Sequence, residues 1–374
     1  MRNIDWVNTL FVCGYQFALL AFLPFYFYYF TPGRGIVLAT LVLVLLTGIS
    51  ITAGYHRFYS HKAYSVNKAV ESVLLFFSTM ASMGSVLDWA SEHRLHHRFV
   101  DKENDPYNIN RGFFYAHMLW FFQKRKKYDP TVVPDLIDSK LLRFQHRHVL
   151  LLHIVTNTLV LLLFGWLCGD FFGALVMVIG LRMFIVHHGT WFINSAAHYW
   201  GEKTYSRELS AVDNFFLALL TFGEGYHNYH HVFASDYRNG IRWYHYDPTK
   251  WLIWSLSKIG LANSLVRIDT LTSKKRIIQE DTHIFVEALR KSTSEKREML
   301  EQKVHELSEK LIKRLADMRL AILEYRQLKK EKNAQFKEKR QEIRIQRLLA
   351  KKEWKSWLNL GREISQIVPL NYHH

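Results

Sequence analysis

Four apolar stretches constrain the fold of this chain more than any other feature of its sequence. Each is about 20 residues long, which is the length that an α-helix needs to cross the hydrocarbon core of a bilayer. They are Leu10–Phe30, Gly35–Tyr55, Val149–Gly169 and Phe171–Trp191. The first is too long for a cleavable signal peptide, and another apolar stretch follows it directly. We therefore predict an all-α integral membrane protein with four transmembrane helices, paired as two hairpins.

The distribution of charge indicates which side of the membrane the connecting segments face. The segment Ala53–Arg147 carries 14 Lys and Arg residues, whereas the first short connection carries only Arg34 and the last carries none. Because cytoplasmic loops are enriched in Lys and Arg, we expect the large segments and both termini to be cytoplasmic. Arg182 lies inside the fourth span, so we expect it to have a protein partner.

Two further apolar stretches, Ser72–Leu87 and Phe215–Phe222, are too short to cross the bilayer. We interpret both as interfacial or re-entrant helices. The interpretation matters, because a fifth span would divide the clustered histidines of this chain between the two sides of the membrane.

The composition changes sharply near residue 261. The chain has 49 Lys and Arg against 33 Asp and Glu, and residues 262–374 contain 26 of the basic and 16 of the acidic side chains. No Gly or Pro occurs between residues 262 and 360. We therefore expect a membrane-embedded domain with a cytoplasmic helical cap over residues 1–261, followed by a charged helical tail over residues 262–374.

Within the tail, residues 281–357 are predicted to form one long helix that stops at Gly361. Apolar residues recur at heptad spacing over about three heptads, which is typical of a coiled coil. They are Val304, Leu311, Met318 and Tyr325, with Leu315 and Ile322 in the alternate positions. Two interpretations remain open: self-association or docking of an electron donor, and a solvated helical hairpin packed against the cytoplasmic face.

Nine of the 20 histidines fall in four clusters beside the expected cytoplasmic ends of the second and fourth spans. The clusters are His56-x4-His61, His93-x2-His96-His97, Asn194-x3-His198 and His227-x2-His230-His231. Spacings of three and four residues place imidazoles on one face of a helix. A lone pair of histidines is usually surface chemistry, but burying this many without metal would leave costly unpaired polar groups. Nine are more than one ion can use, so we predict two metal ions.

These clusters, together with Asp105-Pro106-Tyr107 and Thr190-Trp191, resemble the membrane-bound fatty acyl-CoA delta-9 desaturases, the stearoyl-CoA desaturase family. The resemblance covers about Asp5 to Leu261. It implies a di-iron site with nine histidine ligands, and with Asn194 holding a water on one iron. The implied ligands are His56, His61, His93, His96, His97, His198, His227, His230 and His231. The spacing alone does not assign each histidine to one of the two irons.

The resemblance also implies a narrow, kinked apolar tunnel for the acyl chain. Its bend would involve Trp89, Thr190 and Trp191, and its closed end would lie near Val44 and Gly48 on the second span. A Trp at a membrane boundary is also a common interfacial anchor. The candidates for contact with the substrate headgroup are Arg94, Arg98 and Arg111.

The implied activity is insertion of a cis double bond at carbon 9 of a saturated fatty acyl chain, with O2 as co-substrate. The acyl chain would arrive on coenzyme A or within a membrane lipid. The tail lacks the His-Pro-Gly-Gly signature of a fused cytochrome b5, so we expect electrons from a separate protein of the cytochrome b5, ferredoxin or rubredoxin type. Because neighbouring methylenes are chemically alike, selectivity must come from positioning.

Two other functions remain open: a membrane lipid hydroxylase or a desaturase of other regiospecificity, and a non-catalytic metal-binding membrane scaffold whose tail recruits partners. The two cysteines exclude a disulfide framework and a Cys-ligated zinc site. Nucleic acid is not an expected partner, because the positive charge lies beside spans and no nucleic-acid-binding motif is present. We expect the bacterial inner membrane as the location, or the endoplasmic reticulum if the source is eukaryotic.

Overall fold

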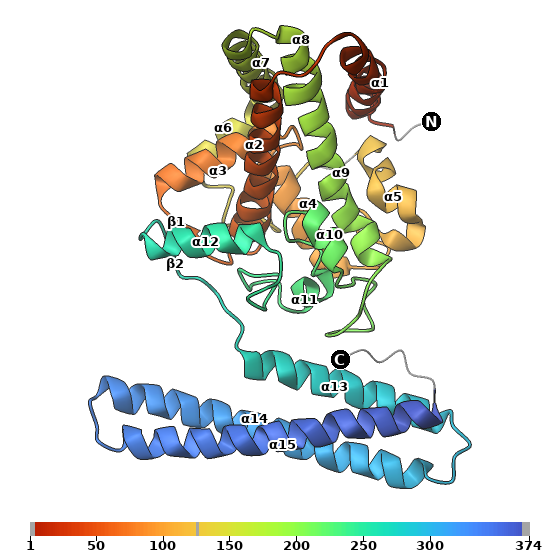
Figure 1. Ribbon diagram of the computed structural model, residues 1–374, viewed down its shortest axis with the longest axis vertical. Helices are drawn as coiled ribbons and strands as arrows, with labels where there is room; N and C mark the ends of the chain where they lie inside the picture. Colours follow the sequence, from red (N-terminus) through yellow and green to blue (C-terminus); the bar gives the residue numbers. More distant parts are fainter. Residues whose placement is uncertain (1–3, 125–126, 369–374) are drawn as a thin grey trace. The chain divides into compact units, whose positions relative to one another are not determined.

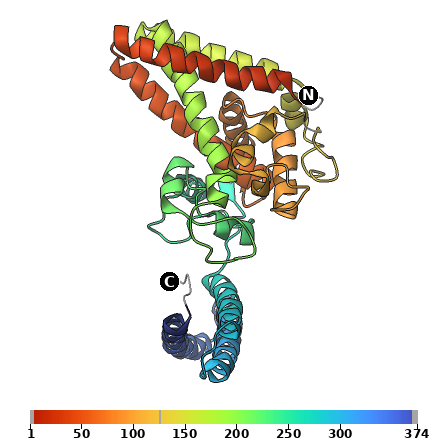
Figure 2. The same cartoon turned by 90° about the vertical axis from the view of Figure 1, so that its right-hand side faces the viewer.

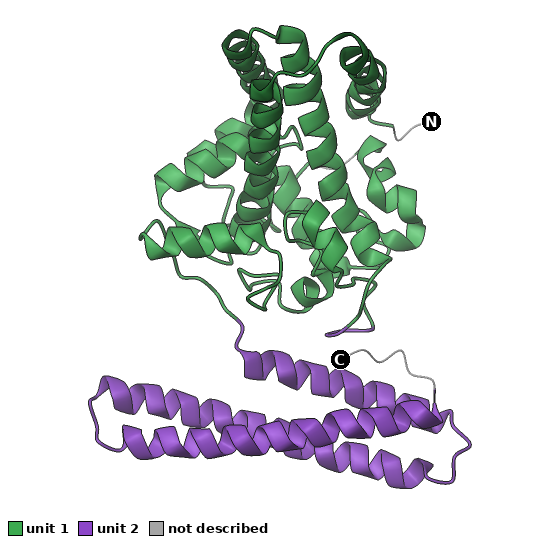
Figure 3. Cartoon of the chain, viewed as in Figure 1, with its two compact units in different colours: residues 1–203, 208–267 green, residues 204–207, 268–374 purple. Residues whose placement is uncertain are grey.

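The computed structural model describes residues 4–124 and 127–368 of the chain. The chain divides into two compact units (Figure 3). Unit 1 comprises Met1–Lys203 and Glu208–Arg267, and unit 2 comprises Thr204–Arg207 and Ile268–His374.

Helices dominate both units, which confirms the predicted all-α class. Among the described residues, regular strands are limited to Ser65–Val66 (β1) and Ala262–Asn263 (β2). These pair antiparallel, with Ser65 opposite Asn263 and Val66 opposite Ala262. The ladder therefore ties the segment after His61 to the end of unit 1.

Four helical segments are long and apolar enough to cross a membrane, as predicted (Figure 2). They are Trp6–Tyr29 (α1), Arg34–Ser60, Val149–Cys168 (α7) and Phe171–His198. The second joins α2 (Arg34–Ser50) to a π-helix, η1 (Ile51–Ser60), and the fourth joins α8 (Phe171–Gly173), a π-helix η4 (Ala174–Leu181), α9 (Arg182–Asn194) and η5 (Ala196–His198). Helices α1, α2 and α7 all pack against η4, so the fourth span forms the centre of the bundle.

The π-helical winding of η1 has a direct consequence for the histidines. The His61 N–H donates to the carbonyl of His56, five residues earlier, at 3.1 Å. Residues linked in this way lie one turn apart, so the wider winding stacks two side chains that an α-helix would point in different directions. Single π-helical turns occur frequently at functional sites for this reason.

Short helices complete unit 1. They are α3 (Lys68–Met80), α4 (Val86–Phe99), η2 (Ile109–Arg111), α5 (Phe113–His117), η3 (Leu119–Phe122), α6 (Lys140–Arg147), α10 (Phe215–Leu220), α11 (His227–Val232) and α12 (Pro248–Lys258). The apolar stretch Ser72–Leu87 is divided between α3 and α4 by a turn, and α10 covers most of Phe215–Phe222. Their expected interfacial or re-entrant placement stays a prediction.

The described residues of unit 2 form three helices (Figure 1): α13 (Thr270–Arg290), α14 (Arg297–Lys330) and α15 (Phe336–Ile367). The prediction of one long helix over 281–357 is therefore wrong, because the chain turns between α13 and α14 and again between α14 and α15. Lack of Gly and Pro permits a helix, but it does not prevent a turn where polar residues such as Ser292 and Asn333 can bond the backbone.

The predicted stop at Gly361 is also wrong. Gly361 is buried inside α15, and the helix continues to Ile367. The heptad residues Val304, Leu311 and Leu315 belong to the apolar core of unit 2, which α13, α14 and α15 share. These heptad residues form an apolar seam that therefore packs against helices of the same chain, as in a helical hairpin. Self-association through this seam is not needed to explain the pattern.

Candidate metal centre

The nine predicted histidine ligands converge in two groups within unit 1. The first group contains His56, His61, His93, His97 and His230, and the second contains His96, His198, His227 and His231. In each group the candidate ligand atoms all lie within 4.8 Å of one another. We refer to these as the five-histidine cluster and the four-histidine cluster. The tertiary structure thus divides the histidines in a way that their spacing could not.

Helix α4 contributes to both clusters because of its periodicity. His93 and His97 are four residues apart and share a face that belongs to the five-histidine cluster, while His96 points to the other cluster. The Ser85 hydroxyl caps the start of this helix by accepting from the Asp88 N–H at 3.2 Å. Helix α11 is used in the same way: His227 and His231 face the four-histidine cluster, and His230 faces the five-histidine cluster.

The ring Nε2 atoms point inward and come unusually close together. In the five-histidine cluster, Nε2 of His230 lies 3.0 Å from Nε2 of both His56 and His97. In the four-histidine cluster, His227 Nε2 lies 3.1 Å from that of His198 and 3.0 Å from that of His231. A metal–nitrogen bond of about 2.0–2.1 Å, as zinc forms with histidine, leaves neighbouring ligand nitrogens about 3 Å apart. The geometry therefore fits a metal ion in each cluster.

Burial favours the neutral form of several of these rings. Burial, followed by repulsion from the neighbouring imidazoles, holds the pKa of His61, His93 and His97 well below the usual value. The same two causes lower the pKa of His230 and His231. Neutral imidazole is the form that binds metal, so the site is poised for coordination at neutral pH.

A buried ion-pair network orients His56. Its Nδ1 lies 2.9 Å from Oε2 of Glu224, and Oε1 of the same carboxylate lies 2.7 Å from an Arg57 nitrogen. Arg57 also reaches Asp247 at 3.0 Å. Burial raises the pKa of Glu224, but Arg57 and His56 outweigh it and lower this pKa to about 2. Glu224 therefore stays charged and directs the Nε2 of His56 into the cluster.

Other ring Nδ1 atoms are held in the same manner. His96 Nδ1 lies 2.8 Å from a carboxylate oxygen of Asp105, and His198 Nδ1 lies 2.6 Å from the Ser210 hydroxyl. The Tyr107 hydroxyl lies 3.3 Å from Nδ1 of His93. Such outer partners fix ring orientation and ligand basicity at metal sites. Sequence reasoning named the Asp105-Pro106-Tyr107 segment, but it did not assign these roles.

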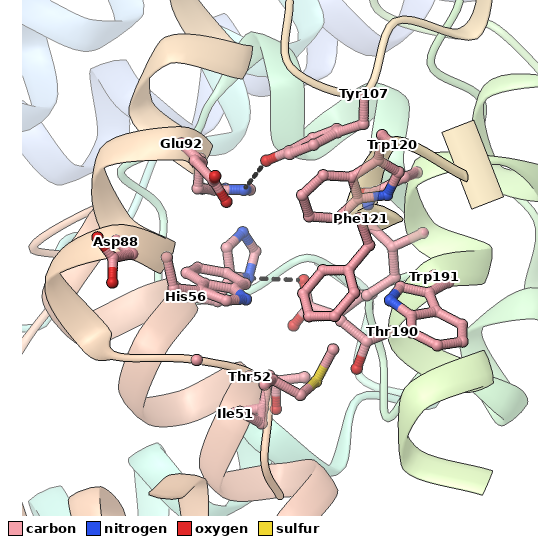
Figure 4. A pocket seen from close by; sticks show the side chains of 17 residues that line it. Ile51, Thr52, His56, Asp88, Glu92, Tyr107, Trp120, Phe121, Thr190 and Trp191 are labelled. Atoms are coloured by element: carbon pink, nitrogen blue, oxygen red, sulfur yellow. Dashed lines mark hydrogen bonds and ion pairs between the residues drawn. The ribbon is translucent and has the colours of Figure 1, made fainter. Parts of the chain in front are cut away.

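A pocket of about 760 Å³, counted with its open mouth, adjoins the five-histidine cluster (Figure 4). Of the predicted site residues, His56, His93, Trp89, Thr190, Trp191 and Asn194 line it. Figure 4 shows Trp120, Phe121 and Trp191 on the side of the pocket opposite His56. Sequence reasoning missed several lining residues, which carry no sequence signal beyond their apolar character: Ile51, Met83, Trp120 and Phe121.

The residues predicted at the closed end of the tunnel lie outside the lining of this pocket. Val44 and Gly48 are not among the lining residues of this pocket. Val44 packs in an apolar cluster, and the Phe222 ring lies so close to Gly48 that a Cβ there would meet it at 2.3 Å. Ile51 and Thr52, further along the second span, line the pocket instead. The placement of the closed end near Val44 and Gly48 therefore stays a prediction.

The predicted headgroup contacts divide into two kinds. The Arg94 guanidinium donates to both carboxylate oxygens of Asp135, at 2.7 and 3.0 Å. Its remaining N–H groups donate to the carbonyls of Ser60, Val132 and Tyr59. All five donors are therefore committed to the fold, which removes Arg94 from the candidates. Arg98 and Arg111 are exposed, and Arg111 stacks on the ring of Tyr115 at 3.7 Å.

Comparison with known proteins agrees with this site. A family model described as fatty acid desaturase matches residues 34–261. Acyl-CoA desaturase 1 of Saccharomyces cerevisiae is 37% identical over 75% of this chain and 55% of its own length. An sn-1 stearoyl-lipid 9-desaturase of Synechocystis is 35% identical over 66% of this chain and 76% of its own length. An acyl-CoA Delta(11) desaturase of Trichoplusia ni is 34% identical over 63% and 70%.

The chain spans little more than half the length of the yeast relative. The family model nevertheless covers both π-helical spans and every histidine of the two clusters. Together with four apolar helices of membrane-spanning length, these matches identify an integral membrane protein that belongs to the fatty acid desaturase family.

Proposed function

We propose that this chain is an O2-dependent desaturase that inserts a cis double bond at carbon 9 of a saturated fatty acyl chain. The observation that carries this proposal is the position of the five-histidine cluster, two of whose members, His56 and His93, line an apolar pocket. An acyl chain in this pocket would bring its methylenes beside the candidate ligands.

We further propose that each cluster holds one iron ion. Imidazole suits iron among other transition metals, and iron bound here would supply the activation of O2. The four-histidine cluster has one ligand fewer than the other. Asn194, four residues before His198, is the candidate to complete it through a water.

The pocket itself would contribute by positioning the acyl chain and by excluding water. The Trp89 ring stacks on His93 with centroids 4.9 Å apart, so a chain that passes Trp89 would lie against the five-histidine cluster. Trp191 and Thr190 line the pocket as well. A fixed apolar channel of this kind selects one carbon pair among chemically similar methylenes by placement.

We infer that the substrate is an acyl-CoA or an acyl lipid, in line with the names of the yeast and Synechocystis relatives. Arg98 and Arg111 are the remaining candidates for contact with its headgroup. Two electrons would come from the substrate and two from a separate donor of the cytochrome b5, ferredoxin or rubredoxin type. We place the clusters and both termini on the cytoplasmic side, from the excess of Lys and Arg between Ala53 and Arg147.

A second candidate is desaturation at another carbon, which the name of the Trichoplusia relative favours. Expression of the chain in a desaturase-deficient host separates the possibilities. Oleate or palmitoleate supports carbon 9, a monoene at another carbon supports the second candidate, and a hydroxy acid would refute both. Bound metal without O2-dependent product would indicate the metal-binding scaffold.

A further inference from the structure

One turn in unit 1 is held by side chains from the second, third and fourth spans, and a side chain of the first span supports one of them. The turn Met80–Gly84 joins α3 to α4, the helix that carries His93, His96 and His97. Ser82 and Gly84 have φ of +57° and +89° within it. Ser82 is in the left-handed region that a non-glycine residue rarely adopts, so the surrounding structure must hold it there.

Arg182 and Asn157 make the densest contacts with this turn. Arg182 is fully buried in the fourth span, and its Nη1 donates to the Met80 carbonyl at 3.3 Å. Its Nη2 donates to the side-chain oxygen of Asn157, in the third span. The Asn157 amide then donates to the Met80 carbonyl and to the Ser82 hydroxyl, both at 3.2 Å.

The first and second spans complete the arrangement. The Tyr15 hydroxyl lies 2.8 Å from Nδ1 of His187, whose Nε2 donates to the Ala81 carbonyl at 2.8 Å. The Tyr55 hydroxyl donates to the Gly84 carbonyl at 3.2 Å. Arg182 donates to three neutral oxygens: the carbonyls of Val178 and Met80 and the side-chain oxygen of Asn157. Of these, the Met80 carbonyl lies at the carboxyl end of α3, where the helix dipole favours a cation.

The turn is also one wall of the apolar pocket. Met83 and Gly84 line the pocket beside Ile51 and Thr52, next to His56. Displacement of the turn would therefore change both the width of the pocket and the start of the helix that carries three candidate ligands. A shift of about 1 Å in a reacting group is enough to cost about a hundredfold in rate.

We propose that Arg182 and Asn157 are positioning residues for desaturation: they fix the turn Met80–Gly84 so that Met83 places one carbon pair of the acyl chain beside the five-histidine cluster. This inference rests on the proposed desaturase function. It assigns to an intramembrane arginine a role in selectivity, in keeping with the high cost of placing such a charge there.

The test compares products made by the full chain in a desaturase-deficient host. Asn157→Ala removes the donor to Met80 and Ser82. We expect monoenes with the double bond at neighbouring carbons to rise about tenfold relative to the main product, an effect of the size that one methylene has on selection in an apolar pocket. Metal content should stay at that of the unmodified chain. Met83→Ala should shift the products in the same way without touching the network.

Thr156→Ala is the matched control, because its buried hydroxyl bonds only carbonyls of its own helix, Leu152 and His153. An unchanged product distribution in active Met83→Ala would overturn the inference, as would equal shifts in Thr156→Ala and Asn157→Ala. If the Asn157→Ala protein does not accumulate in the host, the product distribution of Met83→Ala decides the outcome of the test. Absence of any monoene from the unmodified chain would overturn the proposed function and this inference together.

Discussion

The two units of this chain bury different kinds of side chain. Unit 1 encloses charged groups that are almost inaccessible to water, among them Arg57, Glu224 and Asp247 at 0–1% exposure. The centre of unit 2 is an apolar cluster that includes Phe285, Leu311 and Trp357. Its charged pair Arg314 and Glu353, in contact at 2.6 Å, is less completely buried, with the two side chains 20% and 11% exposed.

This difference indicates that unit 1 carries the chemistry, whereas the packing of unit 2 serves its stability. Apolar packing along a repeated seam stabilises unit 2 without requiring any particular polar geometry. Buried charges in unit 1 are costly unless each finds its partner, so they occur where a specific orientation is needed. We therefore expect substitutions in unit 1 to change activity and substitutions in unit 2 to change local stability. The first two predictions below pair a residue of unit 1 with one of unit 2.

The largest effect is expected at a candidate ligand. His230→Ala removes a ring whose Nε2 lies 3.0 Å from those of both His56 and His97. Product formation should be abolished while the chain remains in the membrane fraction, because the spans are unchanged. Monoene content in a desaturase-deficient host provides the measurement. His305→Ala on an exposed face of α14 is the control and should leave product formation intact; retained activity in His230→Ala would contradict the ligand assignment.

The next effect concerns the carboxylate behind His56. Glu224→Gln keeps the shape of the side chain but removes the charge that orients the ring and pairs with Arg57. Loss of such an outer partner costs about 10–100-fold in metal affinity or activity. Iron titration and product yield are measured together. Glu353→Gln, which removes a carboxylate from unit 2, should change neither; equal losses in both variants would show that the effect is not specific to the cluster.

In unit 2 the largest stability effect is expected from Trp357→Ala. Trp357 is fully buried, packs against Phe285 and donates through Nε1 to Asp281 at 3.0 Å. Truncation of such a residue costs about 3–5 kcal/mol, so hydrogen exchange across α13, α14 and α15 should speed up. Product formation should persist. Leu320→Ala, at a side chain that is 65% exposed, should change stability by no more than about 0.5 kcal/mol.

The smallest effect is a pH dependence in unit 1. Burial raises the pKa of Asp135, but hydrogen bonds from Arg94 and Lys62 outweigh it and lower the pKa to about 2. Because the folded-state value lies below the unfolded one, this carboxylate stabilises the fold above about pH 4, and the contribution is lost as the pH falls toward 2. Asp135→Asn should lower the thermal midpoint near neutral pH and leave it unchanged near pH 2. An equal decrease at both pH values would contradict this origin.

The fold was predictable where a local property was sufficient. Hydropathy alone located the four spans, since a lipid-exposed helix must be apolar along its whole length. Spacing identified the histidines of α4 and α11 as members of common faces. The turns of unit 2 were not predictable in this way, because Gly361 stays inside a helix while Ser292 and Asn333 lie in turns without any Gly or Pro.

The site was predictable in kind but not in arrangement. The surroundings of Gly48 depend on the Phe222 ring, which packs against it from a distant part of the chain. Arg94 looks like a surface cation in the sequence, yet its guanidinium donates hydrogen bonds to Asp135 and to three backbone carbonyls. Such facts depend on which distant groups meet, and no local pattern encodes them.

By itself, the sequence determined that this chain has four apolar helices of membrane-spanning length, nine clustered histidines and the motifs of the fatty acid desaturase family. Only the tertiary structure decided that the histidines divide five and four, that Glu224 and Asp105 orient two of them, and that the turn Met80–Gly84 forms a pocket wall. The physical reason is that hydropathy and residue type act along the chain, whereas coordination geometry is set by distances between side chains on separate helices.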